Sequence, residues 1–225
     1  MYLIMEALML ISLGGLIAVF ESGLSEWVII LKSAASLFFV LAGLCGYRKS
    51  KGNRKVSLYI LLALCCSMAG DVFLALDTEK GIMFILGVAS FAAAHVMFSI
   101  AFCKMCKIRK RDFAVTGMIL GVVLVIMCVG TFDFQGLFPV VIGYAAVISF
   151  MVAKALSLWQ CRQGKERAVG LMMAGGVAFL VSDMLLFFWM FGVGIPKEMQ
   201  SANWIMYYLA QMFQAHALNE RESLS

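Results

Sequence analysis

The chain has 225 residues, of which 63% are apolar and only 14% are charged, and its formal net charge is +5. Soluble domains usually carry about a quarter charged residues, and the mean hydropathy of this chain is +0.96. The charges lie in short clusters between long apolar segments, which gives no reason to expect a nucleic-acid partner. These features exclude a soluble globular domain and predict a single integral membrane domain, residues 1–225.

Eight apolar segments are long enough to cross a bilayer, which takes about 17 to 25 residues for a helix. Because the bilayer holds no water to satisfy backbone groups, these segments should be helical, and they lack the alternating pattern of a β-barrel. The predicted fold class is all-α, a polytopic membrane protein with eight transmembrane helices. The expected spans cover residues 2–20, 27–46, 56–76, 81–103, 113–130, 137–160, 168–191 and 201–218.

Basic residues concentrate in every second loop. The loops at 47–55, 104–112 and 161–167 hold thirteen of the eighteen Lys and Arg residues, and the C-terminal tail adds one more. The loops on the other side hold only Lys80 and Lys197. By the positive-inside rule this asymmetry predicts that both termini are cytoplasmic. In a bacterium the expected location would be the plasma membrane.

Two aspartates lie inside these apolar segments, Asp71 in the third expected span and Asp183 in the seventh. A carboxylate inside the bilayer costs at least a few kcal/mol on insertion scales, so it is normally retained for a function. The two aspartates are therefore the leading candidates for a functional site.

Lys32 in the second span, and Asn203 and Tyr207 in the eighth, fall at a depth comparable to that of the two acids. Asn203, Tyr207, Gln211 and Gln214 recur along one face of the eighth span at helical spacing. Each would be expensive facing lipid, so the cheapest arrangement turns them inward around one cavity. We therefore expect a site built from the second, third, seventh and eighth spans.

Structural interpretations of these residues stay open at this point. Lys32 could extend its ammonium to the membrane surface, as expected for Lys154 in the sixth span, or form an ion pair with the acids. Asn203 could cap the eighth helix, and Tyr207 could belong to the aromatic belt at the membrane interface. The role of Gln211 could be limited to joining helices by hydrogen bonds.

The two histidines, His95 and His216, are placed by their positions toward the cytoplasmic side of this site. The main interpretation of both is a hydrogen-bonded packing residue, and a functional role stays an alternative, foremost for His95. Catalytic zinc usually takes three protein ligands, commonly two or three of them histidines, so no metal is expected. No serine-nucleophile elbow and no Walker or Rossmann glycine motif is present in the sequence. Two buried carboxylates instead suit acid–base chemistry, because one can stay protonated while the other is ionised.

Several segments carry a resemblance to a known family. SMAGDVFLAL followed by GVASFAAAHVMFSIAF, and FLVSDMLLFF followed by NWIMYYLAQMFQAHAL, are similar to paired spans of the YhhN family. Lys32 matches a lysine typical of that family, although Ser33 stands where a proline often follows it. The resemblance covers about residues 5–218.

The YhhN family includes lysoplasmalogenases, integral membrane hydrolases that cleave the vinyl ether bond of lysoplasmalogens to a fatty aldehyde and a glycerophospho-alcohol. The resemblance thus implies eight spans and a lysophospholipid substrate drawn from membrane lipid, with no metal or organic cofactor. It identifies Asp71 and Asp183 as the signature acids that carry acid–base catalysis. For Lys32, Asn203, Tyr207 and Gln211 we expect a part in binding the substrate.

Two rival functions use the same acids. An intramembrane aspartyl protease would suit the sequence AGD, but the glycine two residues before that glycine is replaced by Met68. A proton-coupled transporter or lipid-binding protein would use the acids as a relay or as polar contacts. The separation in sequence between Asp71 and Asp183 is compatible with a repeat of two four-span halves, although no Gly- or Pro-broken span pair marks a transport site.

Overall fold

The computed structural model describes residues 1–50, 53–77 and 80–220. Lys51 and Arg221, which belong to the predicted basic clusters, lie outside these residues. The described part is all-helical, as predicted. Its helices are α1 (Tyr2–Glu21), the short 3-10 helix η1 (Ser25–Trp27), α2 (Val28–Lys49), α3 (Arg54–Leu76), α4 (Ile82–Met105), α5 (Lys110–Val129), α6 (Phe138–Cys161), α7 (Arg167–Phe191) and α8 (Glu198–Asn219).

Seven of these helices, α1 to α7, are long and apolar enough to cross a membrane. The chain is therefore a multi-pass membrane protein. The eighth helix, α8, has 22 residues but carries a row of buried polar side chains that lowers its hydropathy. Its crossing of the membrane and the cytoplasmic position of the termini stay predictions.

Several helices begin a few residues before the start of the transmembrane span predicted from the sequence. α8 starts at Glu198, although the expected span began at residue 201. α3 starts at Arg54, where the side chain of Asn53 accepts a hydrogen bond from the backbone N–H of Val56 at 3.4 Å. Such capping satisfies a backbone group that has no partner inside the helix, so polar residues extend the helix past the hydrophobic stretch.

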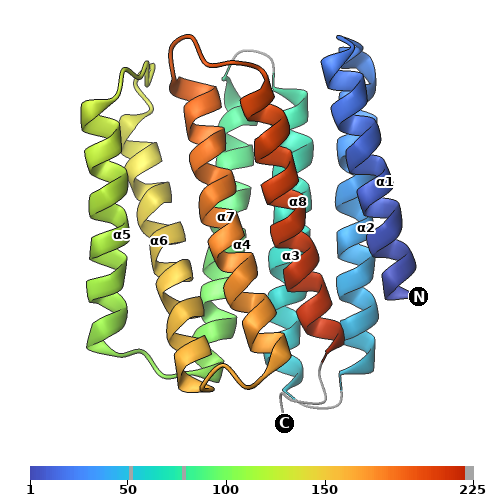
Figure 1. Cartoon of the computed structure of the whole chain (residues 1–225), viewed down its shortest axis with the longest axis vertical. Helices are drawn as coiled ribbons and strands as arrows, with labels where there is room; N and C mark the ends of the chain where they lie inside the picture. The colour runs from blue at the N-terminus through green and yellow to red at the C-terminus, as the bar shows by residue number, and fades with distance from the viewer. Residues whose placement is uncertain (51–52, 78–79, 221–225) are drawn as a thin grey trace.

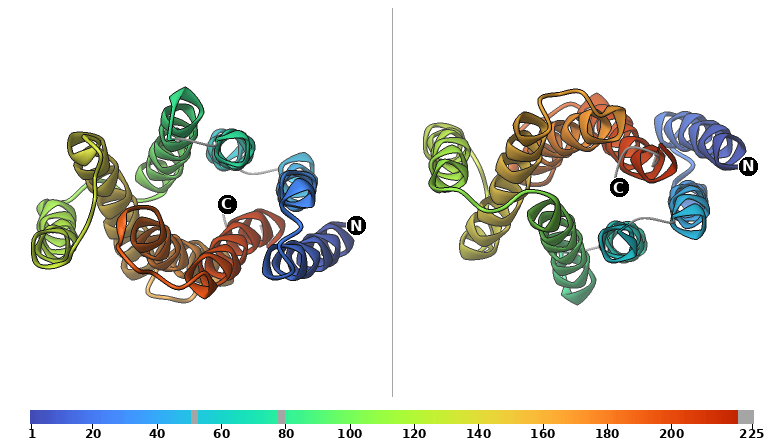
Figure 2. Two further views of the ribbon diagram at one scale, coloured as in Figure 1. Left: turned by 90° about the horizontal axis from the view of Figure 1, so that it is seen from above. Right: turned by 90° about the horizontal axis from the view of Figure 1, so that it is seen from below.

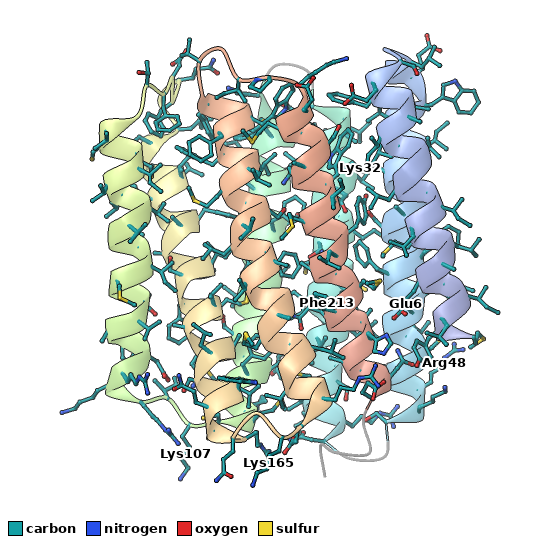
Figure 3. All side chains as sticks on the ribbon, viewed as in Figure 1. Glu6, Lys32, Arg48, Lys107, Lys165 and Phe213 are labelled. Carbon is teal, nitrogen blue, oxygen red and sulfur yellow. The ribbon has the colours of Figure 1, made fainter. Side chains whose placement is uncertain are left out.

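The helices stand side by side in an elongated ring (Figures 1 and 2). α1 and α2 form one end of the ring and α5 and α6 the other, while α3 and α4 face α7 and α8 across the middle. The C-terminal end of α2 and the loops that follow α4 and α6 lie at the lower end of Figure 1, where Figure 3 shows Arg48, Lys107 and Lys165. We call this the basic end and the other the opposite end. Lys32 lies in the half of the bundle nearer the opposite end.

The expectation that Lys154 extends its ammonium to the membrane surface is wrong. It is fully buried, and its Nζ lies 2.9 Å from Asp112 Oδ2 and 3.2 Å from the backbone carbonyl oxygens of Cys106 and Lys107. Because three acceptors satisfy the three N–H groups of a lysine, this ammonium ties the α4–α5 loop to α6. Lys154 therefore has a structural role at the basic end and makes no contact with the polar residues of the predicted site.

A close approach of α2 and α8 near the basic end depends on Gly46. A Cβ at this position would lie 2.7 Å from the carbonyl carbon of Leu218 and 2.8 Å from its carbonyl oxygen, so backbone would have to move. We expect Gly46→Ala to lower the free energy of unfolding by about 1 to 3 kcal/mol, the usual effect of overpacking.

Thermal unfolding of the purified protein in detergent measures this effect. Gly14→Ala is the matched control, since nothing lies within 4 Å of a Cβ built at Gly14 in α1. Equal melting temperatures for the two variants would contradict the close approach of α2 and α8.

Candidate active site

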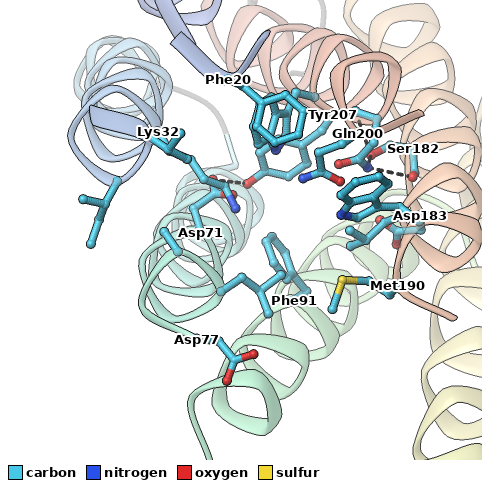
Figure 4. Close-up of a pocket in the computed structure, with 18 of the residues that line it drawn as sticks. Phe20, Lys32, Asp71, Asp77, Phe91, Ser182, Asp183, Met190, Gln200 and Tyr207 are labelled. Atoms are coloured by element: carbon cyan, nitrogen blue, oxygen red, sulfur yellow. Dashed lines mark hydrogen bonds and ion pairs between the residues drawn. The ribbon is translucent and has the colours of Figure 1, made fainter. Parts of the chain in front are cut away.

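A cavity of about 700 Å³ opens within the ring toward the opposite end, where Glu26 of η1 and the loop residues Lys80 and Gln135 form part of its wall. Ligand sites commonly measure about 300 to 1,000 Å³. Asp71 and Asp183 both line it, and Figure 4 shows them on opposite walls. Each acid has its own set of partners, so the two carboxyl groups do not share a hydrogen bond.

Asp71 of α3 is held by a cation and two hydroxyl groups. Its Oδ1 lies 3.3 Å from Lys32 Nζ, while its Oδ2 accepts hydrogen bonds from Ser36 and Tyr207, each at 2.6 Å. The carboxylate is only 2% exposed. Charge-assisted hydrogen bonds this short stabilise an ionised acceptor, so the geometry holds Asp71 as a carboxylate. The backbone carbonyl of Lys32 also accepts a 3.1 Å hydrogen bond from Tyr208.

Asp183 of α7 is held by neutral groups only. Its Oδ2 accepts a hydrogen bond of 2.7 Å from the Tyr144 hydroxyl and lies 3.2 Å from His95 Nε2. No described residue donates to its Oδ1, and the side chain is 14% exposed at the cavity wall. Asp183 therefore offers a free carboxyl oxygen to the cavity, whereas Asp71 has partners on both of its oxygens.

His95 belongs to this site, which corrects its placement from the sequence. Its Nε2 lies 2.9 Å from the Tyr144 hydroxyl as well as 3.2 Å from Asp183, and its Nδ1 is buried without a hydrogen-bond partner among the described residues. A proton on Nε2 gives Asp183 a donor and leaves no buried N–H unpaired. We assign the neutral Nε2–H tautomer on this basis.

His216 lies away from the cavity near the basic end, with Nδ1 3.0 Å from Glu6 Oε1 and Nε2 3.2 Å from Glu220 Oε1. It joins α1 to α8 and has no contact with either site acid. Its interpretation as a hydrogen-bonded packing residue agrees with this position.

The remaining predicted residues of α8 differ in position. Asn203 lines the cavity, and its Nδ2 donates to the carbonyl oxygen of Ser182 at 2.8 Å, which ties α8 to α7. It lies inside the helix, so it is not the cap. Gln211 is fully buried and does not line the cavity, and its amide makes no hydrogen bond with the described residues. Its role in substrate binding stays a prediction.

The partners of the two acids are related by a constant separation in the chain. We call the separation in sequence from Asp71 to Asp183 the repeat interval; the same interval leads from Lys32 to Tyr144 and from His95 to Tyr207. Asp71 of α3 has Lys32 of α2 and Tyr207 of α8 as partners, while Asp183 of α7 has Tyr144 of α6 and His95 of α4. Each acid thus takes one partner from its own set of four helices, α1 to α4 or α5 to α8, and one from the other set, at positions related by the repeat interval.

A ligand in this cavity would lie between two different acids. Asp71 on one wall is a charged carboxylate, and Asp183 on the other wall has a free carboxyl oxygen. Among the described residues, no three His, Cys, Asp or Glu side chains lie together in a group that could hold a metal ion. Three partners of the acids were missed from the sequence: Ser36, Tyr144 and His95. The repeat interval was the available signal for Tyr144 and His95, because it relates them to Lys32 and Tyr207.

Fold and site together define a multi-pass helical membrane protein with a cavity that holds two aspartates on opposite walls. The YhhN family matches the chain over residues 27–218, and the protein belongs to this family. Searches of curated proteins and of solved structures returned no match.

Proposed function

We propose that this protein is a membrane-embedded hydrolase that cleaves the vinyl ether bond of lysoplasmalogens, releasing a fatty aldehyde and a glycerophospho-alcohol. The observation that carries the proposal is the pair of differently held acids facing one cavity. Membership of a family that includes lysoplasmalogenases supports it. We further propose that all eight helices cross the membrane with both termini on the cytoplasmic side, so that the cavity opens to the non-cytoplasmic side.

In the proposed reaction Asp183 is the general acid. Vinyl ethers hydrolyse when a proton adds to the alkene carbon one bond beyond the C–O carbon. The free Oδ1 of Asp183 carries that proton toward the cavity, while Tyr144 and His95 hold Oδ2 in place. Transfer breaks the O–H bond and forms a C–H bond, which leaves an oxocarbenium ion and the Asp183 carboxylate.

The Asp71 carboxylate stabilises that cation electrostatically from the other wall of the cavity. Water then adds to the C–O carbon of the oxocarbenium ion and passes a proton to the Asp183 carboxylate, which restores the acid. The resulting hemiacetal collapses when its hydroxyl proton moves to the glycerol oxygen, releasing the aldehyde and the alcohol. Protons and oxygen atoms balance with one water consumed, and no redox partner is needed.

The ammonium of Lys32 can donate more hydrogen bonds than its ion pair with Asp71 uses. Its ammonium carries three N–H groups, and among the described residues only Asp71 lies within ion-pair distance of Nζ. We propose that the remaining N–H groups bind the substrate phosphate, and that Asn203, which also lines the cavity, contributes to headgroup binding. Tyr207 orients Asp71 through its 2.6 Å hydrogen bond to Oδ2.

A proton-coupled transporter is the second candidate, and the twofold construction of the site favours it. Parallel repeats related by an axis along the membrane normal occur in transporters. In that function the two acids would carry protons between the two sides of the membrane, and no bond in the substrate would break. The two candidate functions therefore differ in one requirement: transport can be observed only across a sealed membrane, whereas hydrolysis also proceeds in detergent.

The test is aldehyde release from a 1-alkenyl lysophospholipid by the purified protein in detergent, where no gradient exists. Choline and ethanolamine substrates should both be assayed, because the headgroup preference is open. Release of one aldehyde for each lysolipid consumed is the expected result. A folded protein that releases none, but takes up substrate when reconstituted in sealed vesicles, would make the transporter the better account.

A further inference from the structure

Cavity-lining residues related by the repeat interval differ in polarity. Lys32, which lies beside Asp71, and two further polar residues, Gln200 and Asn203, line the main cavity. Their counterparts at the repeat interval are Tyr144, Val88 and Phe91, in that order. These counterparts line a second, small pocket of about 70 Å³ between α4, α6 and α7, and the other residues of that pocket except Asp183 are apolar.

The small pocket continues the main cavity past Asp183. The two share Leu74, Phe91, Asp183, Leu186 and Met190 in their walls. On its far side the pocket reaches Val140 of α6, whose side chain is 40% exposed on the outside of the bundle. In a membrane that outer surface faces lipid, so an apolar route runs from Asp183 to the hydrocarbon of the bilayer.

We propose that this small pocket is a subsite for the hydrocarbon chain of the substrate, which leaves the bundle between α4 and α6. The inference rests on the proposed function and adds to it the direction in which the lipid lies: headgroup on the Asp71 side, chain on the Asp183 side. An amphiphile needs a polar and an apolar region, and the main cavity supplies the first through Lys32 while the small pocket supplies the second.

The orientation agrees with the chemistry. In a vinyl ether the carbon that accepts the proton lies on the chain side of the C–O carbon. Asp183 lines both the main cavity and the chain pocket, whereas Asp71 lines only the main cavity. A lipid placed this way puts its proton-accepting carbon beside Asp183 and its ether oxygen toward Asp71 and Lys32.

Val141→Trp tests the subsite because the indole would fill the pocket. For a long-chain 1-alkenyl lysophospholipid we expect KM to rise about tenfold, the loss expected from excluding about two methylene groups from an apolar site. For the analogue with an unsubstituted two-carbon vinyl group, kcat/KM should stay within about twofold of wild type. Val141→Phe should raise KM for the long-chain substrate by a smaller factor. It replaces Val141→Trp in the test if the Trp variant does not fold.

The matched control is Val122→Trp, at a position on α5 that is 57% exposed and lines neither pocket. It should leave the kinetics of both substrates unchanged. If the Val141 variants cleave long and short chains as wild type does, the subsite proposal is wrong.

A binding measurement separates this proposal from the proposed function. A 1-O-alkyl lysophospholipid has no vinyl ether, so its binding, followed as thermal stabilisation of the protein, needs no reaction. If wild type releases no aldehyde but binds this lipid, and Val141→Trp weakens the binding about tenfold, then the subsite stands and the hydrolase proposal falls. If both proteins bind it equally, the subsite proposal falls whatever the activity.

Discussion

Asp183→Asn should lower kcat for aldehyde release by about 100- to 10,000-fold, the usual contribution of a general acid. An amide has no proton acidic enough to give to carbon, while its oxygen still accepts the 2.7 Å hydrogen bond from Tyr144. Because the partners of Asp183 are neutral, no buried charge is left unpaired and the fold should be kept. KM should change little, since the lost interaction acts in the transition state.

Steady-state kinetics with a 1-alkenyl lysophospholipid measure this effect. Asp133→Asn makes the same chemical change at an exposed loop position between α5 and α6 and should behave as wild type. An Asp183→Asn protein that keeps activity within about threefold of wild type would remove Asp183 from the reaction.

Asp71→Asn should affect both stability and rate. Lys32 is 7% exposed, so loss of the carboxylate leaves a buried ammonium without its partner. Breaking a buried ion pair on one side costs about 3 to 5 kcal/mol. Loss of a fixed charge that stabilises the transition state should also reduce kcat about 100-fold or more.

The double variant Asp71→Asn/Lys32→Met separates these effects. It removes both charges, so we expect the melting temperature in detergent to recover most of the loss while kcat stays low. A double variant that regains both stability and rate would show that the ion pair serves the fold alone. In that case Asp71 would have no part in stabilising the cation.

The helical segments and the two acids were predictable from the sequence, because bilayer-length apolar runs and a carboxylate inside them have few physical interpretations. The partners of those acids were harder to predict. His95 and Tyr144 contact Asp183 only because α4, α6 and α7 are rotated toward one another. One sequence contains no measure of that rotation, and depth along each helix placed His95 on the wrong side of the site.

The repeat interval is a signal in the sequence that relates the partners of the two acids to one another. The two acids indicated a repeat, but overall similarity between the halves is faint. The same interval links Lys32 to Tyr144 and His95 to Tyr207, pairs whose members differ in chemical type. Because these pairs differ in residue type, a comparison of residue identity between the halves does not detect them, and the contacts in the structure show which positions correspond.

The most direct test of the account is the isotopic composition of the aldehyde formed in D₂O. The product should be reduced with borohydride as it forms, so that later exchange is prevented, and analysed by mass spectrometry. The account predicts one deuterium at the carbon next to the former C–O carbon, because the proton from Asp183 exchanges with solvent before transfer to carbon. Product formed without deuterium at that carbon would contradict protonation by the carboxyl group and with it the proposed mechanism.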